Sequence, residues 1–145
     1  MDASALTDAA VARSHTVAFA ELSEFEQLLV TIWGIEADVN NGGFDQYYFN
    51  SYGDQALLAP IALREIGAES MAVLVERANA VFGPAGPPAE RNLRQKRLES
   101  VRGAAESLWS ELDQQFWKYP DDIAFLLQKF IERRSNTSLE RTRER

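Results

Sequence analysis

The sequence contains no cysteine and a single histidine, and these absences exclude much of the chemistry that proteins carry out. Without cysteine there is no disulfide and no thiolate metal ligand, and nothing favours an oxidising compartment. His15 alone cannot build a zinc site or a histidine-based nucleophilic pair. No Walker, dinucleotide-binding or Gly-x-Ser-x-Gly pattern occurs. We therefore expect no enzyme activity, no catalytic or metal-binding residue and no cofactor.

Long apolar runs are also missing. The longest, from Ala56 to Leu63, is far shorter than the roughly 20 residues that a membrane span requires. The first residues carry acids and lack the basic region of a signal peptide. We therefore expect a cytoplasmic protein with no membrane contact.

The net charge of −7 is unevenly distributed along the chain. Residues 1–90 hold 13 acidic and three basic side chains, a net charge of −10, whereas residues 91–102 carry a net charge of +4. An acidic surface repels phosphates, so we expect no direct binding of nucleic acid. The basic strip at 91–102 is expected to lie mostly on the solvated surface. Some of it could pair with the acidic half, either within one chain or across a homodimer.

The apolar residues recur with helical spacing, and no segment alternates with the period of a strand. Ser23 followed by Glu26 predicts a capping box at the start of the first clear helix. Pro60 predicts a kink or a helix restart, the segment 83–88 predicts a loop, and Tyr119-Pro120 predicts the end of a long helix. The sequence predicts an all-α, single-domain bundle of about six to seven helices. Its expected parts are a loosely docked N-terminal segment (1–20), a helical domain (21–134) and a flexible basic tail (135–145).

The stretch from Glu36 to Gly53, EADVNNGGFDQYYFNSYG, is the part around which we expect the bundle to be arranged. A helix stop at paired glycines is followed by a short helix that is apolar on all sides, and such a helix is expected to be buried by the rest of the chain. The residues of this structural motif are Glu36, Asn40, Gly42, Gly43, Phe44, Gln46, Tyr47, Tyr48, Asn50, Ser51 and Gly53.

Glu36 lies in the middle of the apolar arc of its helix, where a carboxylate needs a partner. We expect it to accept hydrogen bonds from the free amides of Gly42, Gly43 and Phe44 and so to fix the angle between two helices. The alternative is a general base or metal ligand. Glu36, Asp38 and Asp45 are close in sequence and could suit a hard cation, although Asp38 points away from Glu36 on the helix.

The block NNGGFDQYYFNS resembles the bacterial DNA-mimic protein family. Two later segments, GDQALLAPIALREIGAES and LDQQFWKYPDDIAFLLQKFI, resemble later segments of that family in the same order. The resemblance extends from about Leu22 to Ile131. It implies an all-α fold and a role in which an acidic surface occupies the DNA-binding face of another protein, such as a transcription regulator.

Two main hypotheses for function follow. In the first, the protein is an acidic interaction module whose carboxylates imitate phosphates, since carboxylates at helical i, i+3 or i+4 spacing stand about 5–6 Å apart. In the second, it is a protein-binding or toxin-neutralising module, and its acidity serves solubility only. A carboxylate-based metal or small-ligand enzyme is a minor alternative. The residues predicted for a partner-binding acidic face are Glu21, Glu24, Glu26, Asp38, Asp45, Glu65, Glu69 and Glu76.

Overall fold

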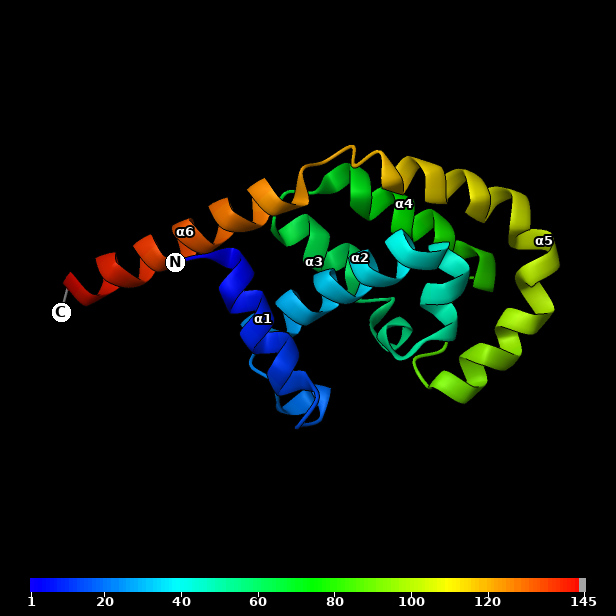
Figure 1. Cartoon of the computed structure of the whole chain (residues 1–145), viewed down its shortest axis with the longest axis horizontal. Coiled ribbons are helices and arrows are strands. Elements are labelled where there is room, and N and C mark those ends of the chain that lie inside the picture. The colour runs from blue at the N-terminus through cyan, green and yellow to red at the C-terminus, as the bar shows by residue number, and fades with distance from the viewer. Residues whose placement is uncertain (144–145) are drawn as a thin grey trace.

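The computed structural model describes residues 1–143, with side chains described through Thr137, and within that range it is helical without strands (Figure 1). The α-helices are α1 (Ala3–Ser14), α2 (Glu24–Phe49), α3 (Ala59–Glu65), α4 (Glu69–Asn79), α5 (Arg91–Trp117) and α6 (Ile123–Arg143). Short 3₁₀ helices are η1 (Phe19–Glu21), η2 (Ser51–Gln55) and η3 (Ala80–Phe82). The predicted fold class is confirmed. No helix in the described residues is both long and apolar enough to cross a membrane.

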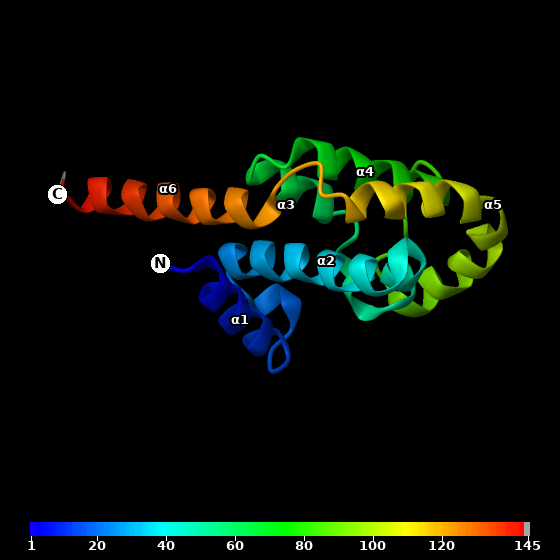
Figure 2. The same cartoon turned by 45° about the horizontal axis from the view of Figure 1, so that its top comes forward.

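Helix α2 lies at the centre of the molecule. Figure 2 shows α1 on one side of it and α3 and α4 on the other, while α5 curves around one end (Figure 1). The predicted capping box is confirmed, because the Ser23 hydroxyl accepts from the Glu26 amide at 3.1 Å and the Glu26 carboxylate accepts from the Ser23 amide at 2.9 Å. Pro60 lies in the first turn of α3, as a helix restart predicts.

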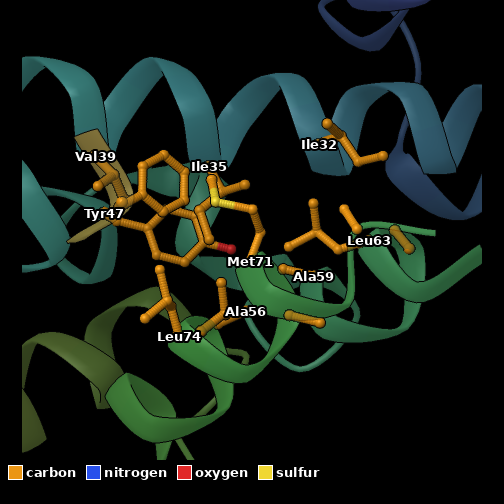
Figure 3. Packing of buried hydrophobic residues seen from close by; sticks show 14 of the residues in the cluster. Ile32, Ile35, Val39, Tyr47, Ala56, Ala59, Leu63, Met71 and Leu74 are labelled. Carbon is orange, nitrogen blue, oxygen red and sulfur yellow. The ribbon is translucent and has the colours of Figure 1, made fainter. Parts of the chain in front are cut away.

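One part of the core forms where α2 meets α4 and the segment that leads into α3. Figure 3 shows Ile35 and Val39 of α2 packed near Tyr47 and Met71, and all four side chains are fully buried. Burial of side chains of this size stabilises the fold by about 1.5–3 kcal/mol each. The apolar face predicted for the first clear helix is therefore the face of α2 that is buried in the core.

Helix α2 is interrupted at Gly43, which has φ 80° and ψ −175°. The helix resumes at once, and the amide of Phe44 donates to Asp113 Oδ1 of α5 at 2.8 Å. A Cβ atom at position 43 would overlap the Asp113 carboxylate. Glycine is required here both for its positive φ and for the close approach of this carboxylate. The predicted turn at the paired glycines is thus a break of one residue.

The N-terminal end of the chain differs from the sequence-based expectation. Helix α1 is docked rather than loose: Ala3, Thr7 and Ala10 are buried, and the Ala3 amide donates to Gln128 Oε1 of α6 at 2.8 Å. Small residues allow this close packing, but they give a weak periodic pattern in the sequence. This weak pattern is why a loosely docked segment was expected. Helix α6 continues to Arg143 and extends past the body of the molecule (Figures 1 and 2). The flexibility expected from residue 135 stays a prediction. Residues 144–145 lie outside the described residues.

Replacing Gly43 by alanine should destabilise the protein by roughly 1–3 kcal/mol, because the new Cβ meets the Asp113 carboxylate and alanine disfavours positive φ. Urea unfolding of both proteins measures the difference. Gly103→Ala is the matched control: Gly103 is inside α5 with open space around its Cβ position, so this variant should gain about 0.5–1 kcal/mol. Equal effects of the two substitutions would contradict the role of Gly43.

Candidate functional site

The centre of the predicted motif is held by Arg94, a fully buried arginine on α5. Its Nε donates to the Tyr48 carbonyl at 2.7 Å, and its two terminal nitrogens donate to the carbonyls of Asn50, Pro88 and Ala89 at 2.8–3.1 Å. Asp54 Oδ1 lies 2.9 Å from Nη2. Every donor direction of the planar guanidinium therefore has a partner. This satisfaction is what allows a charged group to be buried.

Because Gly53 has no side chain, there is space beside its backbone for the side chain of Arg94. A Cβ atom at position 53 would lie within 2.8 Å of Arg94 Nε and closer still to the Tyr47 carbonyl. Beside it, Arg91 and Gln95 of α5 both donate to the Phe49 carbonyl, at 3.1 and 2.9 Å. The first turns of α5 thus satisfy the carbonyls at the end of α2.

The basic strip at 91–102 is mostly engaged within the chain. In addition to Arg91 and Arg94, Arg97 donates to the Phe82 carbonyl at 2.7 Å, and Arg102 pairs with Asp45 at 2.6 Å. The expectation of a mostly solvated strip is therefore wrong for Arg94, which is buried. The other four bases of the strip are exposed, as expected. Two bases, Arg94 and Arg102, pair with acids of the first 90 residues, Asp54 and Asp45, as the possibility of pairing within one chain predicts.

The aromatic residues of the motif separate into buried and exposed members. Phe44, Tyr47 and Tyr48 are fully buried, and the Tyr48 hydroxyl donates to Asn79 Oδ1 at 2.6 Å. Burial raises the pKa of both tyrosines, so their hydroxyls stay protonated. Phe49, in contrast, is 47% exposed, so the expectation of a helix buried on all sides is wrong on that side.

Asp38 is buried, and the prediction that it belongs to an exposed acidic face is wrong. Its Oδ1 accepts from Gln46 Nε2 at 3.0 Å and from Asn50 Nδ2 at 3.1 Å, so the carboxylate ties the first half of α2 to the aromatic part. Among the described side chains, the buried atoms without a hydrogen-bond partner are Asp38 Oδ2 and the Tyr47 hydroxyl.

Glu36 does not bind the amides after the glycine pair, because Asp113 occupies that position. The half-buried Glu36 carboxylate instead accepts from the Tyr119 hydroxyl at 3.2 Å, and that hydroxyl also accepts from Asn40 Nδ2 at 2.7 Å. Burial raises the pKa of Glu36, and the hydrogen bond from Tyr119 opposes this effect. The pKa of Asp113 is likewise raised by burial, against the lowering effect of the Phe44 amide.

The three carboxylates considered for a cation site contact different partners. Glu36 contacts Tyr119, Asp38 contacts Gln46 and Asn50, and Asp45 pairs with Arg102. Among the described residues, no group of three or more histidine, cysteine, aspartate or glutamate side chains is placed to hold a metal ion.

The other predicted acidic residues differ in whether their carboxylates are already paired within the chain. Glu26 belongs to the capping box and lies 3.5 Å from Arg13. Glu69 and Glu76 are exposed but both bind Arg64, at 3.0 and 2.6 Å. Glu21, Glu24 and Glu65 are exposed and form no hydrogen bond or ion pair within the described part of the chain.

Glu24, Glu65 and Glu76 border two neighbouring grooves. Glu24 of α2 and Glu65 of α3 line one groove of about 110 Å³, together with Leu58 and Ile61. Ile61 also lines the second groove, with Arg64 and Glu76. The two grooves therefore share Ile61 as a lining residue, and Leu58 and Ile61 are 42% and 60% exposed. We call this region the acidic surface; it comprises Glu24, Leu58, Ile61, Arg64, Glu65, Glu69 and Glu76. Glu21 lies in η1 and lines neither groove.

The most important residues that sequence reasoning missed are Arg94, Asp113 and Tyr119. Arg94 falls one helical turn before Leu98 on the apolar stripe of α5, so its burial had a periodic signal. Asp113 borders the same stripe. Tyr119 has φ 49° directly after the C-terminal end of α5, and no sequence pattern indicates its contact with Glu36.

A family model described as DMP19-like protein matches residues 20–134. Neither the curated proteins nor the solved structures contain a match to the chain.

Replacing Arg94 by methionine should cost on the order of 3–5 kcal/mol of unfolding free energy, because it strands four backbone carbonyls and Asp54. Chemical denaturation provides the measurement. Arg91→Met removes an arginine one turn away on the exposed side of α5 and should change stability by less than about 1 kcal/mol. Similar losses of unfolding free energy in both variants would contradict the role assigned to the buried position of Arg94.

Replacing Glu36 by glutamine should stabilise the protein at neutral pH but not in acid. A raised pKa in the folded state means that ionisation of Glu36 costs stability, and this cost appears as pH rises from the ordinary value of 4.5 through the folded-state pKa. Urea melts at about pH 4 and about pH 7 should therefore show an advantage for Glu36→Gln that grows with pH. Glu99→Gln, on the exposed face of α5, controls for the loss of one charge. A constant difference across pH would contradict the burial of the Glu36 charge.

Proposed function

This chain belongs to the DMP19-like protein family, and on that premise we propose that it is an acidic interaction module that binds the DNA-binding face of another protein. The single observation that carries the proposal is the acidic surface on α2, α3 and α4. Its four glutamates and one arginine give a local charge of −3.

The geometry of this surface supports a protein partner with a basic face. Glu24 and Glu65 stand on the same groove and have no cation within the described residues, so their charge is available for binding. Exposed Leu58 and Ile61 add apolar area between the acids. Apolar area with a charged rim is typical of protein-binding sites.

The sequence resemblance to bacterial DNA mimics supports a partner that otherwise binds DNA. A lysine- and arginine-rich face that binds phosphates would meet carboxylates here in their place. The Arg64 ion pairs hold Glu69 and Glu76 in fixed positions, which reduces the ordering cost when a partner binds.

The double reversal Glu24→Lys with Glu65→Lys should weaken partner binding at least about tenfold, because the new lysines would face the basic residues of the partner. Partners captured from a cell lysate would be purified and tested for release of their DNA upon addition of the protein. The control, Glu99→Lys with Glu106→Lys, makes the same charge change on exposed positions of α5 and should bind as the wild type does.

Salt separates this function from the alternative of a module whose acidity serves only solubility. Charge-driven binding should fall steeply between about 50 and about 500 mM salt. A partner that binds equally at both concentrations, or that holds DNA and this protein together, would contradict DNA mimicry. Binding centred on Leu58 and Ile61 would then account for a salt-insensitive complex.

A further inference from the structure

A second concave region lies on another side of α2, between α1, α2 and α6. It is a cleft of about 320 Å³, within the size range of small-ligand sites. It shares no lining residue with the two grooves of the acidic surface. Its apolar lining includes Leu29, Ile32 and Leu127, and Trp33, which is 37% exposed, also lines it. A hydrogen bond from the Ala3 amide to Gln128 joins α1 to α6 beside it.

Three carboxylates line the cleft, and Glu36 is the half-buried one, whereas Asp2 and Asp8 are exposed. The Glu36 carboxylate accepts one hydrogen bond, from the neutral Tyr119 hydroxyl, and it forms no ion pair with any described residue. No lysine or arginine is among the described residues that line the cleft. A half-buried carboxylate with no cation nearby is costly, and the cost is removed when a cation reaches it.

We propose that this cleft binds an alkylammonium group, with Glu36 accepting hydrogen bonds from the ammonium and the apolar walls covering the alkyl chain. The Trp33 indole is placed to add a cation–π or apolar contact. This site is independent of the acidic surface, so either can fail without the other.

Other classes of ligand fit the cleft less well. An anion would meet Glu36, Asp2 and Asp8 with no base to receive it. A neutral apolar ligand would cover the carboxylate without supplying a partner for it. A divalent metal needs several oxygen ligands, whereas Asp2 is engaged with the Ser4 amide at 3.0 Å and no metal-binding group of three exists among the described residues.

The test is a titration of the full chain with 1-aminopentane, followed by ¹H–¹⁵N NMR at the Trp33 indole N–H. We expect saturable shifts confined to the cleft, and at least about tenfold weaker binding to Glu36→Gln, because a charged hydrogen bond is lost. Ala124→Leu adds volume at an exposed position on the cleft wall and should weaken binding without affecting folding. Glu106→Gln, away from the cleft, should bind as the wild type does.

Two further probes identify the source of the ammonium group and guard against non-specific binding. Nα-acetyl-lysine N-methylamide presents the ammonium as a protein would: binding of this probe supports a lysine of a partner protein as the occupant, and binding of 1-aminopentane alone supports a free amine. 1-Pentanol has the same alkyl chain without the charge. The proposal is overturned if 1-pentanol binds as tightly as 1-aminopentane, if Glu36→Gln binds like the wild type, or if no saturable shift occurs.

Discussion

The structure depends on two charged side chains of α5 that hold the aromatic half of α2, residues 44–49, at its two ends. Asp113 accepts from the first amide of this half-helix, and Arg94 donates to carbonyls at and just after its last turn. An acid at the amide end and a base at the carbonyl end match the helix dipole and satisfy groups that a buried helix cannot leave unpaired. The half-helix that carries Phe44, Tyr47 and Tyr48 can therefore be buried in the core together with its two ends.

The acidity of the chain is less available than its net charge indicates. Much of the negative charge in the first two-thirds is used internally: Asp38 joins two parts of α2, Asp45 pairs with Arg102, and Asp54 with Arg94. Of the acids left for a partner, Glu24 and Glu65 flank exposed apolar side chains near α3. The position of the free carboxylates, more than their total, defines the surface that can meet a basic protein.

Much of the fold could be predicted from sequence because it depends on local rules. The capping box at Ser23, the restart at Pro60 and the break at the glycine pair each follow from neighbouring residues. The partners of Glu36 and Asp38 could not be predicted in this way, because a carboxylate on a helix has several donors within reach and tertiary packing selects among them. Asp113 lies 69 residues from the amide it binds, and nothing near Gly43 in the sequence identifies it.

The position of both charged caps on α5 also affects how the chain can fold during its synthesis. Arg94 and Asp113 are made well after the aromatic residues whose backbone they bind. A nascent chain that ends before α5 has neither cap, so its aromatic half-helix has unpaired ends and no α5 surface to cover Phe44 and Tyr48. We therefore expect stable folding of this segment on the ribosome only after α5 has been made, and until then Phe44 and Tyr48 lack the apolar surface that covers them in the folded protein.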